Sequence, residues 1–284
     1  MARTAIITDT DSSIPAALAD QYKITQVPIN IHFGNETMAA VEDVDDARLF
    51  ARVDREGKLP STSAPSPGKF AQAYQAAFDA GYDEVLCFTV SSKVSAVYNA
   101  AVTACDLLPG KPVRVVDTEG LSMVQGFMAL AAAEAAQAGM SSQEIVQQAL
   151  EVGKRARLYA ALATLKYLAM SGRVGHLAAG IGGLLDVRPI LTLREGKLDL
   201  LERARTQGKA WGRVIELTRQ AVEQKRVERL AILHVNAVDQ ARAFQEQLCA
   251  VITCTGAILT VELTPGLSVH SGSGMVGVAF VVGQ

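Results

Sequence analysis

The chain has 284 residues, a formal net charge of −2 and a mean hydropathy of +0.20, and this length suits two hydrophobic cores better than one. Hydrophobic residues make up 49% of it, charged residues 20% and aromatic residues 5%. The balanced charge excludes a general attraction to phosphate backbones or anionic membranes, and the few aromatic residues argue against stacking platforms for single-stranded nucleic acid.

The first half of the chain alternates strand and helix signals with short connections. Its expected elements are a strand over residues 4–8, a helix from Pro15, an extended run over 27–33, a helix over 45–55, a helix over 68–80 opened by Pro67, a strand over 84–89, a helix over 94–108, a strand over 113–116, a helix over 122–137 and a helix from a capping box at Ser141 and Glu144. Such alternation predicts a parallel sheet flanked by helices, in a Rossmann-like α/β domain spanning residues 1–158.

The second half is predicted to form an α+β domain over residues 159–284. Its expected elements are a strand over 159–164, a short helix before a glycine-rich segment at 171–183, strands over 189–193 and 197–201 that form a hairpin around 194–196, a helix over 211–224, a strand over 230–234, a helix over 238–251 and strands over 257–262 and 275–282. This order favours a largely antiparallel sheet. Because no low-complexity linker separates the domains, we expect them to pack closely and to hold a ligand in the cleft between them.

The sequence predicts a cytoplasmic protein without a membrane span or a metal site. The first nine residues hold one arginine and a short apolar run, which is not the pattern of a secretory signal. The most apolar segment, residues 121–140, contains Gln125, Glu134 and Gln137, so it reads as a buried helix. The four cysteines form no Cys-x-x-Cys pair and the four histidines are scattered, which favours buried free thiols over disulfides or zinc ligands.

Hydroxyl-rich turns follow three predicted strands of the first domain, and the loop at 61–66 adds further hydroxyls. These turns are residues 9–13, 91–95 and 117–122. In open parallel sheets, ligands bind beyond the carboxyl ends of the strands. Ser91 and Ser92 stand where a helix begins, so backbone N–H groups would face an anion. Each cluster alone is typical of a helix cap, but four clusters in one half favour an anion site.

Two enzyme classes give the alternative interpretation, a stand-alone serine hydrolase or a nucleotide-dependent transferase. For a nucleotide site, no Gly-x-Gly-x-x-Gly follows the first strand, no P-loop occurs, and the glycine-rich residues 270–274 lack the lysine. For a hydrolase, Ser91 or Ser92 would combine with His270, but no Gly-x-Ser-x-Gly elbow is present. The acid of such a triad would be one of Asp9, Asp11 and Asp117.

A series of short motifs extends over the whole chain in a fixed order. They are Thr8-Asp9-Thr10-Asp11-Ser12-Ser13, Thr62-Ser63-Ala64-Pro65-Ser66-Pro67, residues 91–98 (SSKVSAVY), Val116-Asp117-Thr118, residues 165–168 (LKYL), residues 172–175 (GRVG), residues 187–191 (VRPIL) and residues 270–274 (HSGSG). Together they resemble the DegV family, the fatty-acid-binding subunits of bacterial fatty acid kinase. Each motif is loose alone, and the specificity lies in their order.

The resemblance implies that one long-chain fatty acid lies in a tunnel between the domains, with its carboxylate bound by hydroxyls and by the C-terminal histidine. The ligand-binding residues implied are Thr62, Ser63, Ser92 or its neighbour Ser91, Arg173 and His270. Arg173 would lie close to the carboxylate or its phosphorylated product.

The resemblance also implies that the chain is a lipid carrier in phospholipid metabolism rather than an enzyme, with no catalytic residue and no cofactor of its own. A separate ATP-binding fatty acid kinase would phosphorylate the bound acid. Arg203 and Arg205 belong to a basic run that is expected to contact this kinase, and a solvated face is the alternative for that run. A regulatory protein that senses a lipid stays open as a third interpretation.

Overall fold

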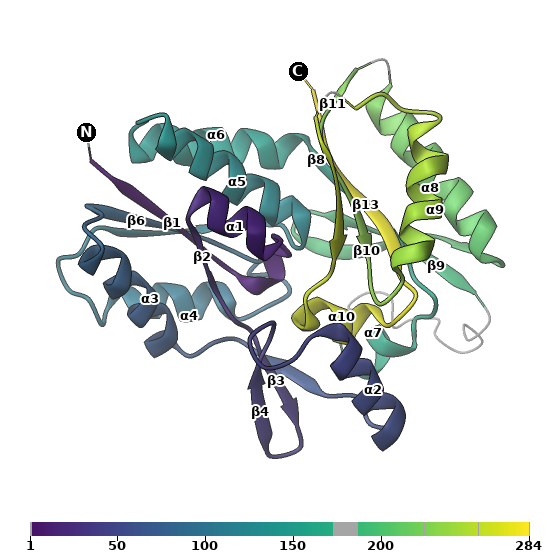
Figure 1. Ribbon diagram of the computed structural model, residues 1–284, viewed down its shortest axis with the longest axis horizontal. Helices are drawn as coiled ribbons and strands as arrows, with labels where there is room; N and C mark the ends of the chain where they lie inside the picture. Colours follow the sequence, from purple (N-terminus) through teal and green to yellow (C-terminus); the bar gives the residue numbers. More distant parts are fainter. Residues whose placement is uncertain (1, 173–186, 224, 255, 284) are drawn as a thin grey trace.

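The computed structural model describes residues 2–172, 187–223, 225–254 and 256–283, and it is built around two main sheets (Figure 1). The sheet of the first half is parallel, and that of the second half is largely antiparallel. The predicted fold class is therefore confirmed.

The parallel sheet has the strand order β2-β1-β6-β7. Its strands are β1 (Thr4–Asp9), β2 (Ile24–Val27), β6 (Glu84–Thr89) and β7 (Val113–Asp117). Every residue of β1 is buried because helices cover both faces of the sheet, which is why this strand reads as a continuous apolar run. The covering helices are α1 (Ala16–Tyr22), α3 (Pro67–Asp79), α4 (Val97–Cys105) and α5 (Met123–Gln137). Pro67 opens α3 as predicted.

A third, small antiparallel sheet with the order β4-β3-β5 projects beside the parallel sheet. Its strands are β3 (Asn30–Phe33), β4 (Glu36–Ala39) and β5 (Ser61–Ser63), and helix α2 (Asp46–Glu56) follows the hairpin. The sequence predicts only one extended run and a loop here. Residues 61–63 show no hydrophobic alternation, and they become a strand because Thr62 pairs with Ile31 of β3.

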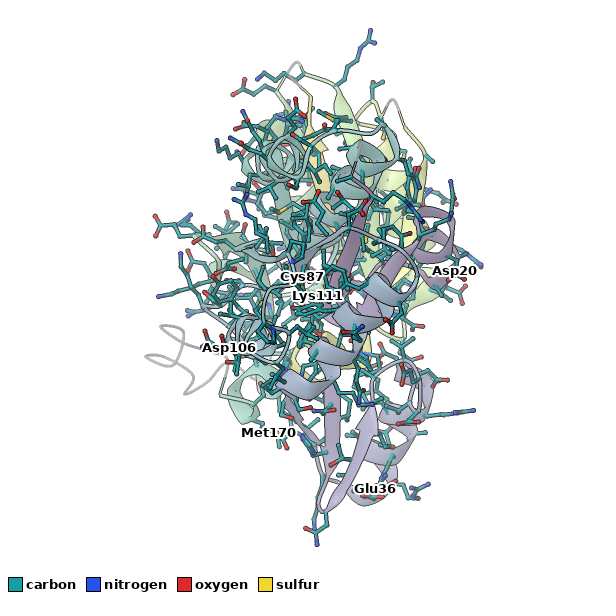
Figure 2. The ribbon with its side chains drawn as sticks, turned by 90° about the vertical axis from the view of Figure 1, so that its left-hand side faces the viewer. Asp20, Glu36, Cys87, Asp106, Lys111 and Met170 are labelled. Atoms are coloured by element: carbon teal, nitrogen blue, oxygen red, sulfur yellow. The ribbon has the colours of Figure 1, made fainter. Side chains whose placement is uncertain are left out.

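The predicted burial of all four cysteines is wrong for most of them. Cys87 on β6 is fully buried, whereas Cys249 is exposed and Cys105 and Cys254 are partly exposed. In Figure 2, Cys87 lies within the body of the molecule, and Glu36 lies at the tip of the projecting hairpin. Apolar neighbours in the sequence did not ensure burial, because helix ends expose one side to solvent.

The second sheet has the order β10-β9-β8-β13-β11-β12, and within it only β11 and β12 pair in parallel. Its strands are β8 (Ala156–Ala161), β9 (Arg188–Arg194), β10 (Lys197–Ala204), β11 (Val227–His234), β12 (Ile258–Glu262) and β13 (Val276–Val282). Helices α8 (Gln207–Val222) and α9 (Val238–Cys249) cover its outer face (Figure 1). The predicted hairpin around residues 194–196 is confirmed.

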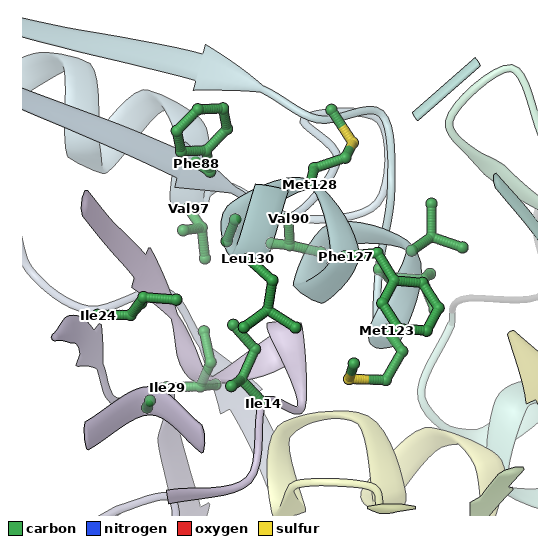
Figure 3. Packing of buried hydrophobic residues seen from close by; sticks show 14 of the residues in the cluster. Ile14, Ile24, Ile29, Phe88, Val90, Val97, Met123, Phe127, Met128 and Leu130 are labelled. Atoms are coloured by element: carbon green, nitrogen blue, oxygen red, sulfur yellow. The ribbon is translucent and has the colours of Figure 1, made fainter. Parts of the chain in front are cut away.

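Helix α5 lies between the two sheets, and α6 (Ser142–Arg155) packs against α5 and β13. Helix α5 contacts β1 and β6 on one side and β8 and β13 on the other, so almost all of its residues are buried. Figure 3 shows Met123, Phe127 and Met128 of α5 in this packing. The burial of α5 explains why the segment at residues 121–140 is apolar. No helix among the described residues is long and apolar enough to span a bilayer.

The chain passes from the first sheet to the second through α6. Ser141 and Glu144 form the predicted capping box at the start of this helix. Strand β8 begins at Ala156, directly after α6, and pairs with β13 and β9 of the second sheet. The predicted domain boundary at residue 158 thus falls inside β8.

Candidate functional site

A cavity of about 480 Å³ lies between the two halves of the chain. The second half contributes a wall of aliphatic side chains from β8, from the residue that follows it, and from β9 and β10. These are Leu158, Ala160, Leu162, Leu191 and Leu198. Residues 158, 160 and 162 face the same side because side chains alternate along a strand, so the antiparallel sheet offers the cavity a continuous apolar surface.

Polar side chains enter the cavity from the loops of the first half and from helix α10 (Pro265–Ser271). They are Asp11, Thr62, Ser63, Ser92, Lys93, Ser95, Ser122, His270 and Ser271. Thr62, Ser63, Ser92 and His270, which were predicted to hold a carboxylate, therefore line one cavity. Their binding role stays a prediction.

Thr62 and His270 meet directly although 208 positions separate them in the chain. The Oγ1 of Thr62 on β5 and the Nε2 of His270 on α10 are 3.0 Å apart, with the donor set by the histidine tautomer. The sequence predicts only a glycine-rich stretch at residues 270–274, but His270 belongs to a helix that Pro265 opens. The pair Thr264-Pro265 is the signal that predicts this helix start.

The two neighbouring serines after β6 have different surroundings. Ser91 is fully buried, and its Oγ donates a hydrogen bond of 2.7 Å to the carbonyl of Gly196 in the β9–β10 hairpin. Ser92 is exposed and lines the cavity. Of the two, Ser92 is therefore the one that can reach a ligand, while the Ser91 hydroxyl joins the two domains. In a hydrolase triad, the Ser91 hydroxyl would have to donate its hydrogen bond to a histidine. Here it donates that hydrogen bond to the Gly196 carbonyl oxygen.

Lys93 also lines the cavity, although the sequence predicts no role for it beyond its place in the motif at residues 91–98. Its Nζ lies 2.7 Å from Glu119 Oε1 and 2.8 Å from the carbonyl oxygen of Glu195. The hydrogen bond to Glu119 raises the pKa of Lys93, so the lysine stays charged while it links the domains at the cavity wall. Glu119 supplies the local countercharge.

The remaining predicted residues are three arginines. Arg173 lies outside the described residues. Arg203 is exposed on β10, and Arg205 is exposed just beyond that strand. A contact between these two arginines and a partner stays a prediction.

A buried carboxylate, Asp9, fixes the edge of the parallel sheet from which the Ser91–Ser92 loop leaves. It accepts hydrogen bonds from the backbone N–H of Val90 at 2.8 Å, from that of Asp11 at 3.0 Å and from Gln125 Nε2 at 3.0 Å. Burial raises the pKa of Asp9 to about 6, although these donors lower it. The carboxylate thus ties β1, β6 and α5 together beneath the cavity.

Replacing Asp9 with asparagine is expected to destabilise the protein at pH 7. The amide would place an N–H donor among N–H donors, which costs about 1–3 kcal/mol for each buried group left unsatisfied. Urea unfolding measures the loss, and Asp20→Asn on the exposed face of α1 is the control (Figure 2). Equal midpoints for both variants would show that Asp9 does not hold this edge.

Comparisons with known proteins agree over the whole chain. The family model described as an uncharacterised protein of the DegV family matches residues 3–283. The chain belongs to the DegV family. A DegV domain-containing protein of Mycobacterium tuberculosis is 35% identical over 285 residues, which cover 98% of this chain and 97% of the relative. One of Streptomyces coelicolor is 32% identical over 274 residues, covering 96% of each.

Solved structures of DegV family proteins share this fold. One from Thermus thermophilus, described as binding fatty acid, has a TM-score of 0.91 at 30% identity and covers 99% of both chains. DegV from Bacillus subtilis, described as a fatty acid binding protein, has a TM-score of 0.89 at 28% identity over 100% of both chains. The arrangement of the sheets around the interdomain cavity is therefore that of the DegV family.

Proposed function

We propose that this DegV family chain binds one long-chain fatty acid in the interdomain cavity and presents its carboxylate to a partner ATP-dependent fatty acid kinase. The observation that carries the proposal is an apolar cavity of about 480 Å³ into which Thr62 and His270 bring a hydrogen-bonded polar pair. The relatives from Thermus thermophilus and Bacillus subtilis that are described as fatty acid binding proteins support it.

The aliphatic wall matches the tail of such a ligand. Each methylene removed from water contributes about 0.8 kcal/mol, so a tail of about sixteen carbons gains on the order of 10 kcal/mol before binding costs. The leucines of β8, β9 and β10 need no polar partner from the tail. This side of the cavity therefore favours an acyl chain over a nucleotide or a sugar.

The polar residues match the head group. A carboxylate accepts hydrogen bonds only, and it would accept them from the hydroxyls of Thr62 and Ser92 and from an N–H of His270. A carboxylate carries a single charge, so it does not require the lysine-rich cradle that a triphosphate needs. Lys93 at the same wall adds a positive charge that Glu119 partly balances.

In the proposed reaction, the partner kinase transfers a phosphoryl group from ATP to the bound carboxylate. One carboxylate oxygen would attack the γ-phosphorus of ATP held by the partner, and the bond from that phosphorus to the bridging oxygen would break. The products are an acyl phosphate and ADP. In this scheme the chain contributes binding and orientation, and the exposed Arg203 and Arg205 contribute to docking.

The proposal is tested by mass spectrometry of lipids extracted from the purified protein after denaturation. A fatty acid in near-stoichiometric amount is the expected result, and added ATP with a cognate fatty acid kinase should convert that acid into acyl phosphate. Repeated extractions without lipid, together with no uptake of added palmitate or oleate, would exclude the binding role. Bound lipid that the kinase leaves unchanged would exclude only the presentation step.

The two serines after β6 provide a matched pair of variants. Ser92→Ala is expected to weaken fatty acid binding by about tenfold, because a hydrogen bond to a charged group is worth about 1.5–3 kcal/mol. Its unfolding midpoint should stay unchanged. Ser91→Ala should instead lower the free energy of unfolding by about 1 kcal/mol, since it removes the interdomain bond to Gly196. Binding titrations and urea unfolding of both variants measure these effects. A loss of binding in Ser91→Ala together with a loss of stability in Ser92→Ala would contradict the assignment.

A further inference from the structure

The proposed function makes no use of Asp46, a buried carboxyl that contacts helix α10, one of the elements that line the cavity. Asp46 is the first residue of α2, and only 2% of it is exposed. Its exposed neighbour Asp45 caps the helix by accepting a hydrogen bond of 2.8 Å from the backbone N–H of Arg48. Asp46 turns towards α10 instead, where its Oδ2 lies 2.6 Å from Ser268 Oγ. The short contact joins α2 to the helix that carries His270.

The hydrogen atoms at this contact can be counted. Ser268 Oγ lies within reach of two acceptors, Asp46 Oδ2 at 2.6 Å and the carbonyl of Leu263 at 3.3 Å, but a hydroxyl donates only one proton. If Asp46 is protonated, it donates to Ser268, and Ser268 donates to Leu263. If Asp46 is ionised, one acceptor loses its donor. The neutral acid is the form that satisfies both contacts.

The surroundings also favour the neutral form. Asp46 Oδ1 is buried without a hydrogen-bond partner among the described residues, and an ionised carboxylate in that position costs several kcal/mol. Burial raises the pKa of Asp46 to about 7, the hydrogen bond from Ser268 opposes this shift, and the charges of Glu262 and Asp45 add to it. Other titratable or charged groups on α2, α10 and the elements packed against them include Asp11, His32, Arg48, Arg52, Lys166 and His270.

We propose that Asp46 is a positioning residue, which in its neutral form holds α10 through Ser268 and so keeps His270 at the fatty acid site. Ionisation of Asp46 would loosen α10 and weaken binding. Helix α10 contributes Gly266, Leu267, His270 and Ser271 to the cavity, so a shift of α10 alters both the polar and the apolar wall. This inference rests on the proposed function.

The direction of the pH effect follows from linkage. The folded state keeps a proton on Asp46 up to about pH 7, whereas the unfolded chain releases it near 3.8. The stability from this group is therefore full below about pH 4, falls as the pH rises to about 7 and stays low above that. Fatty acid affinity is expected to fall as the pH rises through about 7. The reason is that α10 holds its binding-competent position only while Asp46 is protonated.

The test compares palmitate affinity of the wild-type chain, Asp46→Asn and Asp45→Asn between about pH 6 and pH 8.5. Asparagine keeps a donor towards Ser268 but cannot ionise, so Asp46→Asn should match the wild type at about pH 6 and bind about tenfold more tightly at about pH 8.5. Asp45→Asn should follow the wild type, because asparagine caps helices as well as aspartate does. Any pH dependence from His270 is common to all three proteins.

Equal pH dependence in the wild type and Asp46→Asn would overturn the proposal. Hydrogen exchange of the α10 amides separates it from a failure of the proposed function, since it needs no ligand. Exchange in the wild type should accelerate by about tenfold over the same pH range, beyond the intrinsic rate increase, and it should not do so in Asp46→Asn. The same exchange ratio in both proteins would exclude the Asp46 contact as the cause even if palmitate binds.

Discussion

Replacing Ala160 with tryptophan is expected to weaken the binding of long-chain fatty acids by this chain by about 100-fold. Ala160 lies near the end of β8 and lines the cavity between Leu158 and Leu162. An indole at this position would project from the sheet into the space proposed for the acyl tail. Excluding about four methylenes from that space would cost about 3 kcal/mol, which corresponds to about a 100-fold loss of affinity.

The matched control is Ala160→Ser, which changes the side chain at the same position but leaves the cavity open. Lipid extraction and palmitate titration of both variants, with circular dichroism to confirm folding, measure the effect. Shorter acids should survive the tryptophan variant better than longer ones, because the head-group residues stay in place. Retention of full-length acids at wild-type affinity would show that the tail lies elsewhere.

Much of the fold follows from local patterns. The alternation of strand and helix signals in the first half predicts the parallel sheet, since buried parallel strands read as apolar runs and their helices carry clear caps such as Ser141 and Glu144. The β9–β10 hairpin follows from the turn at residues 194–196. These elements could be predicted because each is specified by its own sequence.

The elements that the sequence did not reveal take their structure from distant neighbours. Strand β5 consists of three hydroxyl residues and is a strand only because it pairs with β3. Helix α10 has seven residues, and the glycines within and just after it are typical of a loop. Both elements supply the candidate site, so the hydrogen bond between Thr62 and His270 was not visible before the fold was known.

The roles of adjacent side chains were equally hidden. Ser91 and Ser92 have the same chemistry, and local sequence gives no reason to prefer one as a ligand-binding residue. The structure separates them because the β9–β10 hairpin of the other domain lies over Ser91. The same holds for Asp45 and Asp46, which have the same chemistry. Their roles differ because α10 contacts Asp46 through Ser268. Long-range contacts therefore assign the roles that motifs leave open.

The second large effect is expected at Gly272, the residue that ends α10. Its φ is +80°, and a Cβ there would lie 2.2 Å from a ring carbon of Tyr167. The ring cannot move away freely because it packs edge-on against Phe50 of α2, with 6.3 Å between the ring centres. The glycine-rich stretch at 270–274 is thus explained by close packing, and no phosphate cradle is needed to account for Gly272.

Gly272→Ala is therefore expected to lower the free energy of unfolding by at least about 3 kcal/mol and to weaken fatty acid binding. Gly110 is the control for a positive φ without a close neighbour: its φ is +79°, and no heavy atom lies within 4 Å of the position of its missing Cβ. Gly110→Ala should show only the backbone cost of about 1–2 kcal/mol, without any change in binding. Urea unfolding and palmitate titration of both variants measure the difference.

A double variant identifies the cause of the additional loss. Tyr167→Ala removes the ring that the new Cβ would meet, so adding Gly272→Ala to it should cost less than adding Gly272→Ala to the wild type. Interaction energies of 0.5–3 kcal/mol are common between residues in contact, and this cycle should reach at least about 1 kcal/mol. If the glycine substitution costs the same with and without Tyr167, the ring is not what requires glycine there. In that case the loss would come from the backbone conformation of Gly272, with φ +80° and ψ 157°, which is open essentially only to glycine.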